Sequence, residues 1–194
     1  MTIALRRPMT LTQFLAWEER QELRYEFDGF EAVAMIGGTV AHNRIMRRLH
    51  RALERGLAGK PSELFGPDVK ILTPGKARYP DALVTCTPQA TNAQVVANPV
   101  VVFEVLSAST SRTDRIEKVQ EYQATPSIRR YVILEQDSIG AVVFERRGAD
   151  GWTAYALTDG DTLRMPEIGV EVALAEIYAD IAFAPEGNGT PEDA

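Results

Sequence analysis

Cysteine and histidine are scarce in this chain of 194 residues, which contains one cysteine and two histidines. The single cysteine, Cys86, excludes a disulfide within the chain and any metal site built from several cysteines. No apolar run approaches the roughly 20 residues that a membrane-spanning helix needs, so we expect no membrane segment. The first nine residues carry two arginines but no apolar stretch with a small-residue cleavage site. We therefore predict no signal peptide and a cytoplasmic protein.

The chain also lacks any excess of positive charge, since its formal net charge is -6. Residues 176–194 contain five acids and no lysine or arginine, which leaves residues 1–175 with a net charge of only -1. This balance neither favours nor excludes a nucleic-acid partner. With 45% hydrophobic and 25% charged residues, the composition is that of a globular protein. We predict a single domain over residues 1–184 and a disordered acidic tail over residues 185–194.

The apolar spacing predicts an alternation of helices and strands. Helices are expected at residues 9–23, 43–57, 113–124 and 173–178, and strands at 24–28, 30–36, 67–72, 81–85, 100–106, 130–134, 141–146 and 152–157. A Pro-Gly turn at residues 74–75 is expected between the strands at 67–72 and 81–85. This order predicts an α/β domain with a central mixed β-sheet flanked by helices.

Glu104 is the unusual residue of the strand expected at 100–106, because every other residue of that run is apolar. An isolated carboxylate in apolar surroundings costs several kcal/mol unless it is paired, protonated or bound to a metal. Glu104 therefore indicates a functional site. The alternative is that it lies near the strand end with its carboxylate in water, or pairs with an arginine.

Asp81 and Lys118 extend this indication. Asp81 begins the strand expected at 81–85, and two carboxylates on neighbouring strands can bind one hard divalent ion such as Mg²⁺. Alternatively, Pro80 and Asp81 simply form a turn. Lys118, on the helix expected at 113–124, could orient an attacking water or stabilise charge on a phosphate. The alternative is an exposed helix lysine paired with Asp114.

The helix expected at residues 43–57 carries a row of arginines opposite its apolar side. At 100° per residue, the members of this row are Arg44, Arg48, Arg51 and Arg55, and Arg47 lies beside them. The row could contact nucleic-acid phosphates, or it could be a solvated helix face. His42, just before this helix, could be a general base or phosphate contact, or a polar residue at a helix N-terminus.

Five short segments carry a resemblance to a known family when they are taken in order. They are RYEFDG at residues 24–29, AHN at 41–43, YPDAL at 79–83, FEVLSAST at 103–110 and EKVQEY at 117–122. Together with RYVIL at 130–134 and the segment 168–178, they resemble the Uma family of restriction-endonuclease-like proteins. That family is a branch of the PD-(D/E)XK nuclease superfamily, and the resemblance covers roughly residues 9–180.

The resemblance implies a restriction-endonuclease-like core and a Mg²⁺ or Mn²⁺ site. It implies that Asp81 and Glu104 are metal ligands, with the carbonyl of Val105 as a third. Leu106 stands where the superfamily usually has its catalytic lysine, which makes Lys118 on the next helix the counterpart. Glu26 resembles an additional acid from an N-terminal element, and His42 matches a recurrent histidine.

These observations predict a metal-dependent endonuclease that hydrolyses phosphodiester bonds, most naturally in DNA. A homodimer is expected, because two symmetric sites can cut two strands. Two other classes stay open. One is a non-catalytic dimeric nucleic-acid-binding or regulatory protein on a nuclease fold, and the other is a metal-dependent hydrolase of small phosphoesters.

Overall fold

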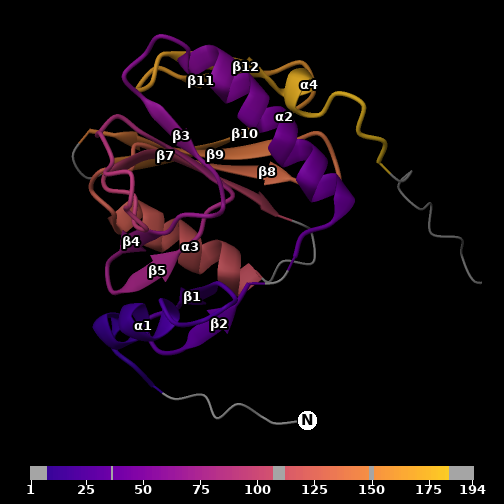
Figure 1. Cartoon of the computed structure of the whole chain (residues 1–194). Coiled ribbons are helices and arrows are strands. Elements are labelled where there is room, and N and C mark those ends of the chain that lie inside the picture. The colour runs from indigo at the N-terminus through magenta and orange to yellow at the C-terminus, as the bar shows by residue number, and fades with distance from the viewer. Residues whose placement is uncertain (1–7, 36, 107–111, 149–150, 184–194) are drawn as a thin grey trace, which may run out of the picture.

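The computed structural model describes residues 8–35, 37–106, 112–148 and 151–183. The helices are α1 (Leu11–Glu18), α2 (Val40–Leu57), α3 (Arg112–Ala124) and α4 (Leu174–Ile177). The strands are β1 (Tyr25–Phe27), β2 (Ala32–Ala34), β3 (Glu63–Phe65), β4 (Ile71–Thr73), β5 (Lys76–Arg78), β6 (Ala82–Thr85), β7 (Pro99–Leu106), β8 (Arg130–Glu135), β9 (Ala141–Arg147), β10 (Gly151–Leu157), β11 (Thr162–Met165) and β12 (Val170–Ala173). Figure 1 shows their arrangement.

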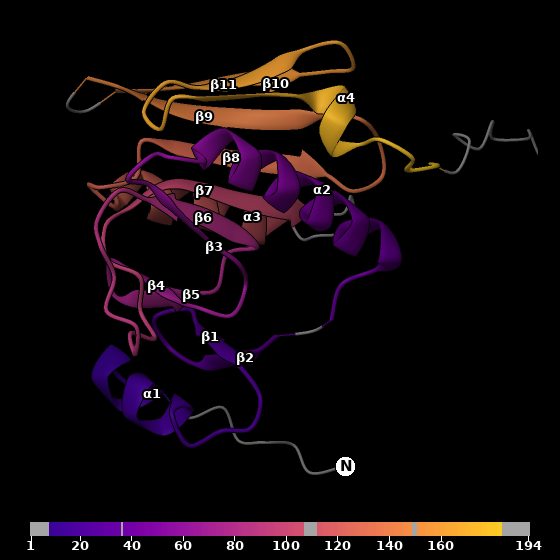
Figure 2. The same cartoon turned by 45° about the horizontal axis from the view of Figure 1, so that its top comes forward.

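A six-stranded sheet forms the centre of the molecule, with strand order β10-β9-β8-β7-β6-β3. Only the β7–β8 pair is parallel, so the sheet is mixed, as predicted. The connection between these two parallel strands contains α3, which covers one face of the sheet. The other face is covered by α2, α4 and the β11–β12 hairpin (Figures 1 and 2).

β7 is buried on both faces of the sheet, which explains its continuous apolar sequence. Its odd-numbered residues, including Phe103 and Val105, pack into the core beneath α2. Its even-numbered residues Val102 and Leu106 pack into the core that also contains Tyr122 of α3. Because side chains alternate along a strand, Glu104 belongs to this α3 face.

A smaller sheet, of strand order β2-β1-β5-β4, lies beside α1 at the end of the molecule where the described chain begins (Figure 1). Phe14 of α1 stacks on Phe27 of β1 with ring centroids 5.0 Å apart. Thr10 caps α1 and forms a capping box with Gln13, as expected for a threonine at this position. The helix ends at Glu18, earlier than the predicted residue 23, and the Gln21 N–H then closes a turn on the Glu18 carbonyl at 3.0 Å.

Two expectations about local structure were wrong. The Pro-Gly turn at residues 74–75 joins β4 to β5 in the smaller sheet, rather than joining β4 to the strand that follows Asp81. Helix α2 begins at Val40, three residues earlier than predicted, because the Thr39 side chain accepts the backbone N–H of His42 and caps it. The short strands β3, β5, β11 and β12 were not predicted.

Three further expectations concern the C-terminal tail, one segment of the family resemblance and membrane-spanning helices. The tail predicted over residues 185–194 lies outside the described residues, as does the segment 107–110 of the family resemblance. Across the described ranges, no helix is both long enough and apolar enough to cross a membrane.

Candidate functional site

The antiparallel pairing of β6 with β7 brings Asp81 beside Glu104. Ala82 is in register with Phe103, so the residue before β6 lies next to the end of β7. The Asp81 carboxylate accepts the backbone N–H of Val105 at 2.7 Å. Both acids line one cavity of about 250 Å³, together with Glu26, His42 and Lys118. Five residues that the sequence predicted as a site, from five separate segments of the chain, thus line a single cavity.

Glu104 is the most deeply buried of these acids, with 4% of its surface exposed. Its Oε1 atom accepts hydrogen bonds from Lys118 Nζ at 2.9 Å and from the Tyr122 hydroxyl at 2.8 Å. Burial raises the pKa of Glu104 to about 7, and the negative charges of Asp81 and Glu26 act in the same direction against the charge of Lys118. Glu104 is thus neither a solvated strand end nor an arginine partner.

Lys118 reaches Glu104 from α3, on the sheet face where Leu106 also lies. Its side chain is 16% exposed, so the interpretation as an ordinary surface lysine is wrong. Burial acts to lower the pKa of Lys118, but the charges of Glu104 and Glu26 outweigh it and hold the pKa above its ordinary value. Lys118 is therefore a buried cation beside the acids.

Glu26 lies on the far side of Lys118, with 3.8 Å between Lys118 Nζ and its carboxylate. It accepts the backbone N–H of Tyr79 at 3.1 Å and a hydrogen bond from Arg78 at 3.0 Å. Arg78 in turn donates two hydrogen bonds of 2.7 Å to Glu121 of α3. This network fixes the position of Glu26 relative to Lys118.

Sequence reasoning gave no role to Tyr122, Arg78 or Glu121. Tyr122 follows Lys118 by four residues, which places both on one face of α3, and that spacing was a usable signal. The pairing of Arg78 with Glu121 spans 43 residues and leaves no local pattern in the sequence.

His42 lies in the first turn of α2, as the interpretation as a polar residue at a helix N-terminus expects, and it also contacts Asp81. Its Nε2 atom is 3.1 Å from the Asp81 carboxylate. The hydrogen bond to Asp81 raises the pKa of His42 above its ordinary value, although burial opposes this. Protonated His42 would compensate part of the negative charge around Asp81.

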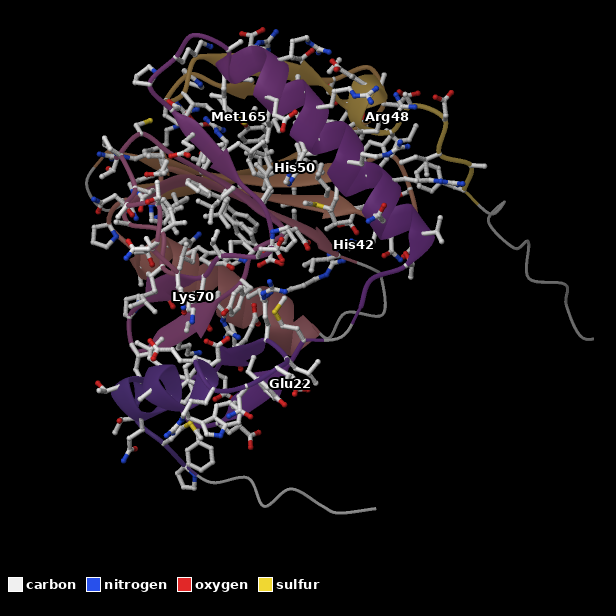
Figure 3. The ribbon with its side chains drawn as sticks, in the orientation of Figure 1. Glu22, His42, Arg48, His50, Lys70 and Met165 are labelled. Atoms are coloured by element: carbon white, nitrogen blue, oxygen red, sulfur yellow. The ribbon has the colours of Figure 1, made fainter. Side chains whose placement is uncertain are left out.

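The predicted row of arginines divides between the two flanks of α2. Arg48 and Arg55 face the C-terminal segment, where they pair with Asp180 and Glu176 at 2.5 Å. Arg51 instead lines a hollow on the opposite flank together with Arg47, which the sequence placed beside the predicted row. Figure 3 shows this division through the labelled Arg48 and His50, which point to opposite sides of the helix.

The donor set of the cavity fits a hard divalent ion. Carboxylate and carbonyl oxygens are the ligands that Mg²⁺ and Mn²⁺ prefer. The carbonyl of Leu106 accepts from Gln136 next to β8, so by alternation the backbone groups of Val105 point toward β6 and Asp81. Within the described part of the chain, no three histidine, cysteine or acidic side chains converge as a ready metal cluster. An ion here would rely on Asp81, Glu104 and the Val105 carbonyl.

The fold defines the class of protein. It superposes with a TM-score of 0.73 on the crystal structure of a protein described as a "putative nuclease belonging to DUF820" from Anabaena variabilis, covering 88% of this chain and 98% of that one. At 14% identity this similarity establishes the fold, a restriction-endonuclease-like mixed sheet flanked by helices, as predicted.

The chain belongs to the Uma2 family, described as "Putative restriction endonuclease", whose model matches residues 11–177. This confirms the family resemblance. Two uncharacterised proteins of Synechocystis sp. are similar to the chain. One, slr1290, is 31% identical over 174 residues, covering 88% of this chain and 92% of the relative. The other, sll1609, is 27% identical over 157 residues, covering 78% and 89%.

Proposed function

We propose that this protein is a metal-dependent endonuclease that hydrolyses phosphodiester bonds in DNA. Membership of a family of nucleases supports the general class of enzyme. The observation that carries the specific proposal is Glu104, a buried carboxylate held by Lys118 and Tyr122 beside Asp81 at an accessible cavity. A protein that only bound DNA would have no use for a carboxylate whose burial is so costly.

Asp81, Glu104 and the Val105 carbonyl would hold Mg²⁺ or Mn²⁺. When bound, the ion would stabilise negative charge on the phosphate oxygens and lower the pKa of a bound water. The hydrogen bond from Val105 to Asp81 at 2.7 Å orients that carboxylate before any ion binds. This preorganisation reduces the entropy that the site loses on binding.

The other residues of the cavity act on the substrate or on the two acids. Lys118, as a cation 2.9 Å from Glu104, positions the attacking water or stabilises negative charge on the phosphate in the transition state. Glu26 holds Lys118 in place from the other side. His42 binds Asp81 and places a proton donor at the edge of the cavity. Two copies of the chain would provide the two sites needed to cut both strands.

The first test is calorimetric titration of the protein with Mg²⁺ and Mn²⁺, paired with cleavage of supercoiled plasmid DNA. We expect wild type to bind the ions and to nick the plasmid only when they are present. Glu104→Gln keeps the shape of the side chain but removes its charge, and should lose both properties. Wild-type protein that neither binds the ions nor cleaves DNA with them would exclude the proposed function.

Metal binding should depend on pH through Glu104. Because the pKa of this carboxyl is about 7 without metal, a proton competes with the ion below that pH. The Mn²⁺ affinity should fall about tenfold per pH unit below pH 7 and level off above it. Calorimetry between pH 5.5 and 8.5 measures this profile.

Tyr122→Phe should move that profile to higher pH. The Tyr122 hydroxyl donates to Glu104 at 2.8 Å and favours its ionised form, so its removal raises the pKa of Glu104 further. The contact of His42 with Asp81 is kept in this variant, so a shift of the profile is attributed to Glu104 and not to His42. Tyr155→Phe is the matched control, since the Tyr155 hydroxyl bonds Arg130 outside the cavity. An identical pH profile for Tyr122→Phe and wild type would refute the role of Tyr122.

A further inference from the structure

A second hollow, of about 510 Å³, runs along the flank of α2 that faces away from α4. It shares the lining residues His42 and Asp81 with the acid cavity, so the two hollows adjoin. Farther along the helix its lining includes Arg47, His50 and Arg51. Both histidines of the chain therefore lie on this one flank of α2, and Figure 3 shows them along the helix.

The two flanks of α2 differ in how their arginines are compensated. On the flank toward α4, Arg48 and Arg55 are each paired with an acid. On the flank of the hollow, Arg47 and Arg51 are exposed, and neither has an ion-pair partner among the residues that the structure describes. Within the described part of the chain, the hollow thus has two guanidinium groups without an ion-pair partner that lead to the acid site, and its lining also includes the acid Glu54.

The spacing of His42, Arg47 and Arg51 along α2 suits a polyanion with regularly spaced charges. Arg47 and Arg51 are one helical turn apart, a rise of roughly 6 Å, and His42 and Arg51 are separated by a rise of roughly 14 Å. A DNA strand rises about 3.4 Å per nucleotide, so the length of α2 between His42 and Arg51 matches about four nucleotides.

We infer that this hollow binds the phosphate backbone of the DNA strand that enters the acid cavity, with Arg47 and Arg51 contacting phosphates about two nucleotides apart. The inference rests on the proposed nuclease function and identifies where the substrate lies. It keeps Arg51 of the row predicted from the sequence and Arg47 beside it, and it omits Arg48 and Arg55 because they already have ion-pair partners. Guanidinium groups suit this role because they bind phosphate in a bidentate manner.

The test is fluorescence anisotropy with a fluorescein-labelled 20-base-pair duplex in EDTA, where no metal-dependent cleavage occurs, over a series of salt concentrations. Arg47→Ala/Arg51→Ala should weaken binding about tenfold or more. It should also reduce the slope of log K against log salt by about 1.8, since each phosphate contact contributes about 0.9. Arg48→Ala/Arg55→Ala removes the same charge from the other flank and should leave the slope unchanged.

The outcomes separate this inference from the proposed function. Equal losses in the two double variants, or no loss in either, would overturn the inference. Glu104→Gln should keep the wild-type salt slope while it loses cleavage. If wild type cleaves DNA with metal but Arg47→Ala/Arg51→Ala binds normally, the hollow is not the substrate site and the nuclease function stands. If wild type binds with the expected slope but never cleaves, the hollow stands and the nuclease function fails.

Discussion

Replacing Asp81 by asparagine is expected to abolish metal-dependent DNA cleavage, with a fall in rate of about a thousand-fold or more. The amide has nearly the same shape as the carboxylate, and its oxygen can still accept the N–H of Val105. The variant therefore removes the charge of Asp81 while the end of β7 stays in place. Conversion of supercoiled plasmid to nicked and linear forms at saturating Mn²⁺ measures the rate.

Asp68→Asn is the matched control for this variant. Asp68 is an exposed acid that pairs with Arg24 and does not line the acid cavity, so its loss should leave the rate unchanged. The thermal midpoint of Asp81→Asn should stay within a few degrees of wild type, which shows that the fold is intact. Cleavage by Asp81→Asn at more than about a tenth of the wild-type rate would argue against Asp81 as a metal ligand.

Replacing Lys70 by methionine is expected to destabilise the protein by about 3–5 kcal/mol. Lys70 and Glu18 form a buried ion pair with Nζ–Oε2 at 2.5 Å, and their side chains are only 3% and 6% exposed. The Tyr79 hydroxyl donates to the same carboxylate at 2.7 Å. Methionine would leave Glu18 buried without its cation. Urea unfolding measures the free energy of unfolding.

Two comparisons make this prediction specific. The double variant Lys70→Met/Glu18→Leu should recover part of the lost stability, because it removes both charges together but leaves the Tyr79 hydroxyl without its acceptor. Arg55→Ala breaks an exposed pair with Glu176 and should cost less than about 1 kcal/mol. A loss of less than about 1 kcal/mol in Lys70→Met would mean that the pair contributes little. Because Tyr79 is two residues from Asp81, this pair also ties α1 to the segment that carries the acid.

Glu104 could be singled out from the sequence because its signal is local, whereas Asp81 stood out only beside Glu104 and within the family segments. A carboxylate in the run Val100–Leu106 is costly wherever that strand lies, so it indicates function without any knowledge of its neighbours. The ordered segments of the family extend this indication to Glu26, His42 and Lys118, and all of these side chains do line one cavity. Whether they bind a metal stays a prediction.

Contacts between distant segments had no such signal. The turn at residues 74–75 was predicted correctly, but its partner strand was wrong because the choice of sheet depends on the whole fold. Helical periodicity placed Arg48, Arg51 and Arg55 on one side of α2. It could not reveal that two of them form ion pairs, Arg55 with Glu176 of α4 and Arg48 with Asp180 just after that helix. The angular position of an arginine on α2 follows from the sequence, whereas its ion-pair partner depends on which segment packs against that flank of the helix.

The sequence by itself determined the class of fold, the family and the acids, since apolar periodicity, a charge within an apolar strand and the order of short segments are all properties of the linear chain. Only the tertiary structure decided that Lys118 and Tyr122 share one oxygen of Glu104 and that Arg78 joins Glu26 to Glu121. The physical reason is that α3 returns across the sheet between two parallel strands. That packing sets distances between residues far apart in the chain, and no local pattern encodes them.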